Sequence, residues 1–525
     1  MRVLVADPIA DEGIRLLREA GHQVDVKTGQ APAALQAAVA DYDALVVRSE
    51  TQVTEAILGA GKRLQVVGRA GVGIDNIDVN AATRQGILVI NAPTANIIAA
   101  AEHTLALLLS MARHVPQAHH KLRAGHWGRK EFTGTQLRGK TLGVIGLGKV
   151  GTEVAKRARA FEMRILANDP FVSEERAKSM GIELADKDTV LSQSDFISVH
   201  VPMNSVTKGL IGKEELTKVK PGVRFLNTAR GGVIDEQALY DAVQSGRVAG
   251  AAIDVFSEEP AKDSILFKSD KIIVTPHLGA STNEAQALVA IELAEQLLEV
   301  FKGRPAKYAV NAPVVVPEAL AVLAPFVDVG MLLGRIATQM AQGQVNSITI
   351  RYEGEIAKHD SLFLKAAVVG GLLSPVSEER VNAVNVNHIV GQRGMKVNEE
   401  KGAESGAYRN LLAVELHTSQ GKTTVAGTSA FGHTHIVQVN DYRMDVRISN
   451  GYMLFIENQD RPGMIGNIGT IAGKADVNIS FMEVGRLDRR GKAMMAIGLD
   501  EPMPEAALKQ ILAIPGILSA RLVKA

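Results

Sequence analysis

A glycine-rich turn near the middle of the chain has the residue types and spacing that bind a dinucleotide. The apolar stretch at residues 142–145 is followed by Gly146, Gly148 and Gly151. Gly146 permits a tight turn, Gly148 lets the backbone approach a pyrophosphate, and Gly151 allows a helix at residues 152–161 to pack closely on the sheet. The first N–H groups of that helix would face the phosphates. The residues of the turn that we expect to bind the cofactor are Gly146, Gly148, Lys149, Val150 and Gly151.

An acidic residue follows this turn at the distance that a ribose requires. Residues 164–168 form the next expected strand, and Asp169 ends it, 23 residues after Gly146. A carboxylate there accepts hydrogen bonds from a ribose 2′-OH and repels a 2′-phosphate. Pro170 and Phe171 follow without a cation. The sequence therefore predicts NAD rather than NADP as the cofactor.

Composition restricts the class of protein that carries this site. A length of 525 residues favours three or four domains, and 46% hydrophobic residues are enough for sizeable cores. The formal net charge of +1 offers no field for nucleic acid or an acidic membrane surface. The chain has no cysteine, which excludes disulfides and thiolate chemistry and fits a reducing cytoplasm. The apolar run at residues 97–112 is interrupted by Glu102 and His103, and we expect neither a membrane-spanning helix nor a signal peptide.

The first 311 residues alternate short apolar stretches with helical patterns, which predicts two doubly wound α/β lobes with a ligand cleft between them. Long helices are expected at residues 98–114 and 282–302, the second with Thr282 as its N-cap. Strands are expected at residues 3–6, 43–47, 64–69 and 88–91, then at 142–145, 164–168, 195–200, 224–227, 250–254 and 272–275.

The last third of the chain has a different pattern. Residues 311–317 contain two prolines and read as a linker, and residues 318–447 mix helices with alternating strands. Asn450-Gly451 predicts a turn before a final βαββαβ, ferredoxin-like unit. Its elements are expected at residues 452–457, 464–474, 478–486, 493–499, 505–512 and 517–523.

Six motifs resemble those of the D-2-hydroxyacid dehydrogenase family, and within it most closely the long-form D-3-phosphoglycerate dehydrogenases. They are RAGVGIDN (69–76), NAPTAN (91–96), AEH (101–103), NTARGG (227–232), DVFSEEP (254–260) and PHLGAST (276–282). The resemblance implies a flavodoxin-like substrate lobe at residues 1–96 plus 283–311 and a Rossmann NAD domain at 97–282. It also implies an α+β intervening domain at 312–447 and an ACT domain at 448–525.

The same resemblance assigns the catalytic residues, and the chemistry explains their types. Oxidation of a secondary alcohol needs a base for the hydroxyl proton while hydride leaves for nicotinamide, and His277 suits that role near neutral pH. Glu259 would hydrogen-bond the imidazole and stabilise its charged form. Arg230 would bind the substrate carboxylate through its planar fork. Further cofactor contacts are implied for Thr228, Asp254, His277 and Gly279.

The implied substrate is anionic at both ends. Arg48, Arg69 and Arg129 match positions that contact phosphate in the phosphoglycerate enzymes. Backbone N–H groups of the segment at residues 71–73 would hold the carboxylate. The substrate-binding residues expected from the resemblance are Arg48, Ser49, Arg69, Gly71, Val72, Gly73, Asn96 and Arg129.

The final unit resembles an ACT domain through the segment at residues 458–463. Such modules pair across subunits and bind an amino acid, so Asn458, Asp460 and Asn478 are the expected L-serine site. The family often has His or Tyr in place of Asn458, and a purely dimerising role is the alternative. His433 and His435 alternate on an expected strand without a third ligand, so we expect no metal site.

The leading hypothesis is therefore NAD-dependent oxidation of D-3-phosphoglycerate to 3-phosphohydroxypyruvate, the entry step of phosphorylated L-serine biosynthesis. A related enzyme acting on glyoxylate or hydroxypyruvate is the first alternative, and an NAD-sensing scaffold is the second. The resemblance implies a homotetramer with one contact through residues 98–114 and the Trp127 loop and another through the ACT domains.

Overall fold

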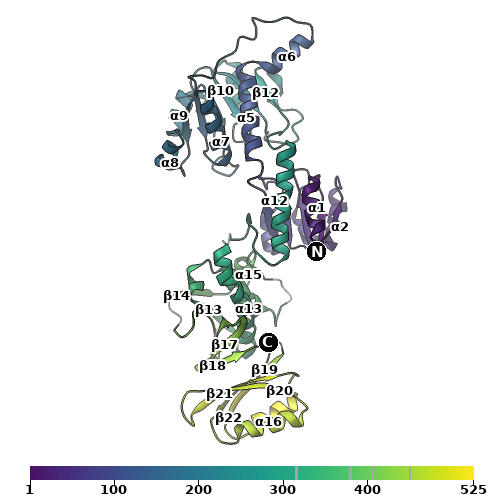
Figure 1. Cartoon of the computed structure of the whole chain (residues 1–525), viewed down its shortest axis with the longest axis vertical. Coiled ribbons are helices and arrows are strands. Elements are labelled where there is room, and N and C mark those ends of the chain that lie inside the picture. Colours follow the sequence, from purple (N-terminus) through teal and green to yellow (C-terminus); the bar gives the residue numbers. More distant parts are fainter. Residues whose placement is uncertain (314–316, 378–380, 404–405, 449–450) are drawn as a thin grey trace.

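The structure is a computed structural model that describes residues 1–313, 317–377, 381–403, 406–448 and 451–525. Residues 314–316 of the predicted linker and Asn450 of the predicted turn lie outside the described residues. The described residues form four β-sheets with their helices, which follow one another along a single long axis (Figure 1). We call these units the first lobe, the second lobe, the mixed-sheet domain and the C-terminal domain. In Figure 1 the second lobe lies at one end of the molecule and the C-terminal domain at the other.

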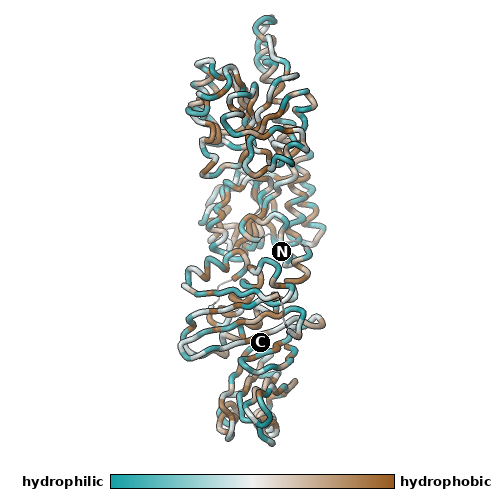
Figure 2. Tube along the Cα trace, turned by 90° about the vertical axis from the view of Figure 1, so that its left-hand side faces the viewer, coloured by the Kyte–Doolittle hydropathy of each residue, from teal (hydrophilic) through white to brown (hydrophobic). Residues whose placement is uncertain are grey.

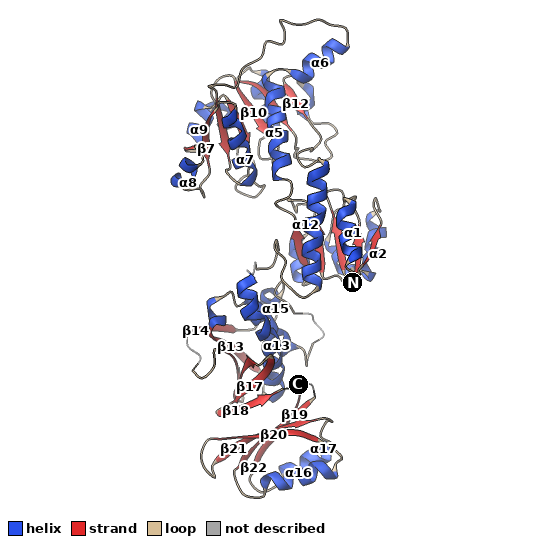
Figure 3. Cartoon of the chain, viewed as in Figure 1, coloured by secondary structure: helices blue, strands red, loops and turns tan. Residues whose placement is uncertain are grey.

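The first lobe is a parallel sheet with helices on both faces (Figure 3). Its strands are almost entirely apolar, as burial on both faces requires, although the polar edge strand β2 was not expected from the sequence. Helices α1 and α12 pack on one face, and α2, α3 and α4 pack on the other. In sheet order the strands are β2 (Gln23–Val26), β1 (Arg2–Val5), β3 (Ala44–Val47), β4 (Val66–Arg69) and β5 (Leu88–Asn91). The helices are α1 (Asp11–Glu19), α2 (Pro32–Ala38), α3 (Glu55–Ala60), α4 (Val79–Arg84) and α12 (Asn283–Phe301).

The second lobe is also a parallel sheet, and its strand order reverses between β6 and β9, where α/β proteins bind ligands. Helices α5, α7 and α8 cover one face, and α9, α10 and α11 cover the other. In sheet order the strands are β12 (Ile272–Val274), β11 (Val248–Ile253), β10 (Val223–Asn227), β9 (Phe196–Val199), β6 (Thr141–Ile145), β7 (Arg164–Asn168) and β8 (Glu183–Leu184). The helices are α5 (Ile97–Ala112), α6 (Val115–Arg123), α7 (Lys149–Ala160), α8 (Glu174–Ser179), α9 (Lys187–Gln193), α10 (Lys213–Lys218) and α11 (Glu236–Gln244).

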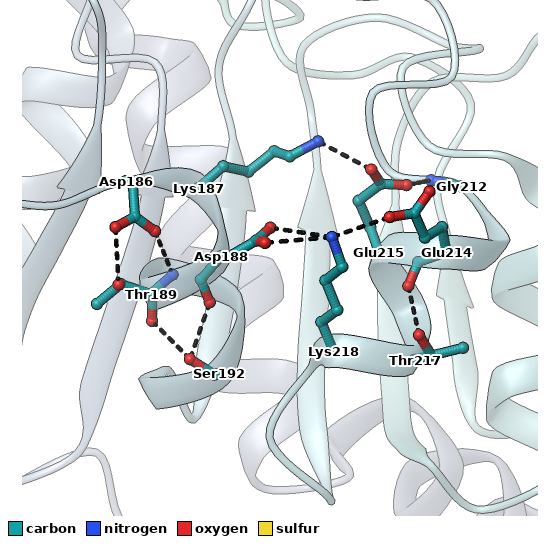
Figure 4. Close-up of polar contacts among 10 residues, drawn as sticks. All are labelled: Asp186, Lys187, Asp188, Thr189, Ser192, Gly212, Glu214, Glu215, Thr217 and Lys218. Atoms are coloured by element: carbon teal, nitrogen blue, oxygen red, sulfur yellow. Dashed lines mark hydrogen bonds and ion pairs between the residues drawn. The ribbon is translucent and has the colours of Figure 1, made fainter.

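A polar network joins α9 and α10 at the surface of the second lobe (Figure 4). The Lys218 ammonium lies 3.1 Å from Asp188 on α9 and 3.0 Å from Glu214 on its own helix. Lys187 lies 2.9 Å from Glu215, whose second oxygen accepts the Gly212 N–H. These contacts fix how two short helices sit on the sheet.

The mixed-sheet domain packs a long apolar helix, α13 (Pro317–Met340), against its sheet. Among the described residues, the stretch Glu318–Met340 is the one helix long and apolar enough to cross a membrane by length and composition. It is instead a core helix, because it packs on α14 and on strand β16. In sheet order the strands are β14 (Val397–Gly402), β13 (Val345–Gly354), β15 (Asn410–Thr418), β16 (Gly421–Ala430), β17 (His433–Val439) and β18 (Tyr442–Arg447). The remaining helices are α14 (Leu362–Leu373) and α15 (Val386–Gln392).

The C-terminal domain has the predicted βαββαβ order. Its two helices cover one face of the sheet, and the opposite face shares a hydrophobic core with α13 and β18. Hydrophobic segments accordingly run through the interior of every unit (Figure 2). In sheet order the strands are β20 (Ile479–Arg486), β21 (Lys492–Leu499), β19 (Tyr452–Gln459) and β22 (Ile517–Lys524), with helices α16 (Met464–Lys474) and α17 (Glu505–Leu512). The predicted fold class is confirmed.

Candidate active site

The glycine-rich turn after β6 requires glycine for steric reasons. Gly146 has φ of 95°, and a Cβ there would lie 2.6 Å from the carbonyl oxygen of His200. A Cβ on Gly151 would lie 2.1 Å from the carbonyl oxygen of Gly146. A side chain on Gly146 would push the turn away from His200, which follows β9, and one on Gly151 would push helix α7 away from the turn.

Helix α7 begins three residues earlier than predicted, at Lys149, with Gly148 as its N-cap. The first turn therefore contains Lys149, Val150 and Gly151, whose N–H groups have no partner within the helix. A Cβ built on Gly148 meets no atom within 4 Å, so the space in front of these N–H groups is open. An open cradle at a helix N-terminus fits the pyrophosphate of a dinucleotide.

Asp169 lies at the end of β7 beside this turn. One of its carboxylate oxygens accepts the Leu147 N–H at 2.8 Å, and the other accepts the Phe171 N–H at 2.9 Å. Each oxygen keeps a lone pair for a ribose hydroxyl. The carboxylate is thus fixed next to the phosphate cradle, where a nicotinamide dinucleotide without a 2′-phosphate fits.

His277 and Glu259 form a hydrogen-bonded pair beyond the ends of β11 and β12. His277 Nδ1 lies 2.7 Å from Glu259 Oε2, which leaves Nε2 as the ring nitrogen that can exchange a proton with substrate. Burial disfavours the charged form of Glu259, but hydrogen bonds from His277 and from the Phe256 N–H outweigh it and hold the pKa of Glu259 below its usual value. An ionised carboxylate behind an imidazole is the arrangement of a supported general base.

Asp254 holds the loop that carries His277. Its side chain is fully buried, and its oxygens accept the N–H groups of Leu278 at 2.8 Å and Gly279 at 2.9 Å. It also accepts the Thr275 hydroxyl and lies 3.1 Å from His103 Nε2. These bonds place Asp254 behind the loop, so the contact with a cofactor that the resemblance implies stays a prediction.

Arg230 extends from the end of β10 toward the first lobe. Its Nη1 donates to the Ala229 carbonyl at 2.7 Å, and Asn227 fixes the loop by donating to the Arg230 carbonyl at 2.8 Å. Its Nε lies 3.5 Å from Asp75 Oδ2 on the first-lobe loop at residues 71–76. The structure therefore brings the predicted carboxylate ligand of one lobe to the predicted N–H cradle of the other.

Arg48 and Arg69 stand at the ends of neighbouring strands of the first lobe. The Arg69 guanidinium lies over Gly71, and its buried Nε has no hydrogen-bond partner among the described residues. Burial, with the nearby charge of Arg230, lowers the pKa of Arg69 to about 10. Buried Asp7, which the sequence did not indicate, accepts the Arg48 N–H at 2.6 Å and positions that strand end. This cationic cluster is suited to a multiply charged anion.

Four other predicted residues have different surroundings. Ser49 and Val72 are exposed beside the cluster, Asn96 precedes α5, and buried Thr228 hydrogen-bonds Thr104 through its hydroxyl at 2.7 Å. Arg129 is not brought to Arg48 and Arg69. It lies on the exposed loop after α6, which projects from the far end of the second lobe (Figure 1).

Sequence reasoning missed His200 beside the cofactor turn, and it missed the partner of the predicted residue Lys149. His200 faces the turn, hydrogen-bonds Ser198 through Nε2 at 2.7 Å, and burial lowers its pKa to about 4, so it is neutral at pH 7. Lys149 Nζ lies 5.7 Å from the centre of the Tyr308 ring, a contact between the lobes. No motif signals that His200 meets the Gly146 turn or that Lys149 meets Tyr308, because in each case the two segments are far apart in the chain.

The residues of the predicted serine site are separately engaged within one chain. Asn458 is fully buried and donates to the Gln459 carbonyl, Asp460 lies 3.4 Å from Arg486, and Asn478 donates to Asp500 at 2.6 Å. On β17, His435 Nδ1 lies 2.7 Å from Asp445 Oδ1, so this histidine takes part in a hydrogen bond on the sheet. A cavity of about 500 Å³ lies between the start of α13 and strands β15 and β16, away from the interlobe residues.

Comparison with known proteins agrees with this geometry. Family models match residues 105–279 (D-isomer specific 2-hydroxyacid dehydrogenase, NAD binding domain), 322–440 (D-3-phosphoglycerate dehydrogenase intervening domain) and 452–516 (ACT domain). D-3-phosphoglycerate dehydrogenase of Synechocystis is 44% identical, over 100% of this chain and 94% of the relative. The Archaeoglobus fulgidus enzyme of the same name is 41% identical over 100% of both chains. The crystal structure of TT0316 protein from Thermus thermophilus, 33% identical, matches with a TM-score of 0.55 and covers 59% of this chain and 100% of its own.

The fold and the site define an NAD-dependent oxidoreductase of the D-isomer specific 2-hydroxyacid dehydrogenase class, which confirms the predicted class and cofactor. Identity above 40% over the full length of the chain narrows this class to one family. The chain belongs to the D-3-phosphoglycerate dehydrogenase family.

Proposed function

We propose that this chain oxidises D-3-phosphoglycerate to 3-phosphohydroxypyruvate with NAD, as the first step of phosphorylated L-serine biosynthesis. The observation that carries the proposal is the meeting of Arg230 with the first-lobe loop at residues 71–76, beside Arg48 and Arg69. A cluster of three arginines suits a substrate with both a carboxylate and a phosphate.

In this proposal each residue has one task. Arg230 and the N–H groups of Val72 and Gly73 bind the carboxylate and orient C2, whereas the Gly71 N–H donates to the Arg69 carbonyl at 2.9 Å and shapes the loop. His277 accepts the C2 hydroxyl proton at Nε2, and Glu259 stabilises the resulting imidazolium through Nδ1. Bound NAD supplies the hydride acceptor.

Arg48 and Arg69 bind the phosphate from within the same chain. Arg129 would bind the phosphate held by a neighbouring subunit. It lies on the arm formed by α6 and the loop after it, and this arm projects away from Arg48 and Arg69 of the same chain. Helix α6 buries none of its residues, and Trp127 is 80% exposed, which supports pairing of the arms in a dimer.

The test compares kcat/KM for NADH oxidation by 3-phosphohydroxypyruvate and by unphosphorylated hydroxypyruvate. We expect a preference of about a hundredfold, near 2.7 kcal/mol of differential transition-state binding. Comparable rates would indicate a general 2-hydroxyacid reductase and remove the phosphate role of Arg48 and Arg69. No turnover with either substrate would favour an NAD-sensing scaffold.

We further propose a cytoplasmic homotetramer that L-serine inhibits through its C-terminal domains. Pairing of these domains would bring Asn458 and Asp460 of one subunit toward Asn478 of its neighbour, and the buried Asn458 Oδ1, which lacks a partner among the described residues, supports a polar ligand there. Sedimentation at assay concentration measures the assembly, and a serine titration of the rate measures the inhibition. A monomer, or a rate indifferent to serine, would contradict the respective part.

A further inference from the structure

Asp75 lies where a substrate carboxylate would bind. Its Oδ2 is 3.5 Å from Arg230 Nε, and the pair meets directly above Gly73. A Cβ built on Gly73 would lie 2.4 Å from Arg230 Nη2 and 2.9 Å from Asp75 Oδ2. The carboxylate and the guanidinium thus share the space over the backbone that we assign to the substrate carboxylate.

The charges around this position explain why an anion occupies it. The positive charges of Arg230 and Arg48 both lower the pKa of Arg69, and Asp75 is one of two carboxylates that act on it in the opposite direction. The other carboxylate, Asp7, is already bound to the Arg48 and Thr51 N–H groups and the Thr51 hydroxyl. Of the two carboxylates, Asp75 is therefore the one that these hydrogen bonds do not hold.

Exposure shows which partner is able to leave. The Asp75 side chain is 69% exposed, whereas that of Arg230 is 28% exposed and is also held by the Ala229 carbonyl. Asp75 can rotate into water at small energetic cost, while Arg230 stays in place.

We propose that the Asp75 carboxylate occupies the position of the substrate carboxylate in the free enzyme. Asp75 binds Arg230 there and leaves it when substrate binds. The proposal rests on the proposed function, because it takes Arg230 as the ligand of the substrate carboxylate. Substrate binding is then an exchange of one carboxylate for another across the two lobes. The exchange keeps Arg230 paired in the free enzyme and weakens the hold of the site on simple anions.

The test compares Asp75→Asn, which removes the competing charge, with Asp75→Glu, which keeps it. Asp41→Asn is the matched control, because it removes an exposed carboxylate elsewhere on the same lobe. The measurements are KM and kcat for 3-phosphohydroxypyruvate with saturating NADH, and the inhibition constant of sulfate as a simple anion. For Asp75→Asn we expect both KM and the sulfate constant to fall by about two- to fivefold, the range of a largely exposed ion pair, with a smaller change in kcat. Asp75→Glu and Asp41→Asn should stay near the unmodified enzyme.

Two results would overturn the proposal. A higher KM for Asp75→Asn would mean that Asp75 orients Arg230 for substrate rather than competing with it. Unchanged KM and sulfate constants would mean that Asp75 is merely solvated. Arg230→Lys separates this failure from failure of the proposed function, because an unchanged KM in that variant would remove Arg230 as the carboxylate ligand whatever Asp75 does.

Discussion

At the scale of single residues, His277 combines an unusual backbone conformation with a clear chemical role. Its φ of 53° lies in the left-handed region, which is uncommon for residues other than glycine even though asparagine, aspartate and histidine adopt it more often than the rest. The conformation persists because its N–H donates to the Asp254 carbonyl at 2.9 Å and the next two N–H groups bind the Asp254 carboxylate. Backbone strain that is compensated in this way is typical of a functional site.

The substitution His277→Asn tests the general base without disturbing this backbone, since asparagine tolerates the left-handed region. We expect kcat to fall by about a hundred- to ten-thousandfold, the usual contribution of general acid–base catalysis. NADH affinity, measured by fluorescence titration, should be nearly unchanged. His433→Ala, on the mixed-sheet domain, is the control. Retained turnover in His277→Asn would exclude His277 as the base.

Glu259 gives the pair a definite dependence on pH. Its pKa in the folded chain lies below the ordinary value of 4.5, so its contribution to stability is complete above that value and is lost as pH falls through the folded pKa. We therefore expect Glu259→Gln to lose less unfolding free energy than the unmodified chain between pH 7 and about pH 3. Urea unfolding at several pH values across this range measures the loss of unfolding free energy, and Glu258→Gln, at the exposed neighbouring residue, is the control. Identical pH profiles would show that the pair does not stabilise the fold.

At the scale of elements, the end of β12 and the start of α12 hold the catalytic loop between them. The loop at residues 275–282 leaves the second lobe, carries His277, and enters the helix that packs on the first-lobe sheet. Thr282 caps that helix as predicted, since its hydroxyl accepts the Ala285 N–H at 3.1 Å. The cap therefore fixes the point where the chain returns to the first lobe.

Removal of this cap should weaken the fold by a measurable amount. Thr282→Ala leaves an N–H of the first turn without its partner, and we expect about 1 kcal/mol less unfolding free energy in urea titrations. Thr282→Ser keeps the hydroxyl and should lie close to the unmodified chain. Equal losses in the two variants would show that the methyl group, and not the hydrogen bond, is responsible.

At the scale of the whole molecule, neighbouring domains are joined by two kinds of contact, one apolar and one polar. The mixed-sheet and C-terminal domains share one hydrophobic core, which includes Phe326 of α13 and Phe455 of β19. Arg335 of α13 also donates to the Ala525 carbonyl at 2.9 Å. The first lobe meets the mixed-sheet domain through a polar contact, in which Asn382 donates to the Gly86 carbonyl at 2.8 Å. We infer that the last two domains move together.

A substitution in the shared core tests this coupling. Phe455 is 1% exposed, and Phe455→Ala should lower the unfolding free energy by about 3–5 kcal/mol. Hydrogen exchange should accelerate in α13 as well as in β19, because α13 belongs to the hydrophobic core that Phe455 of β19 fills. Phe455→Leu is the milder control. Unchanged protection of α13 would show that the two domains unfold independently.

The sequence by itself determined the elements and motifs that depend on local chemistry. The alternation of strands and helices and the Thr282 cap depend on residues that are close together in the sequence. The glycine spacing around Gly146 is a local motif, although the steric need for Gly146 comes from distant His200. All three features are present as predicted. The start of α7 differs from the prediction, because the helix begins at Lys149 directly after its N-cap Gly148. Three closely spaced glycines do not indicate which of them caps the helix.

Only the tertiary structure decided which distant residues meet. Three features join segments that are far apart in the chain, and no sequence pattern indicates that these segments meet. They are the Asp75–Arg230 pair, the Lys149–Tyr308 contact and the burial of Asp254. The structure also places the loop after α6, which carries Arg129, away from the first lobe with the two arginines that the family resemblance had grouped with it. Charge pairing and burial depend on how whole lobes pack, and that packing is set by many weak contacts distributed along the chain rather than by any single motif.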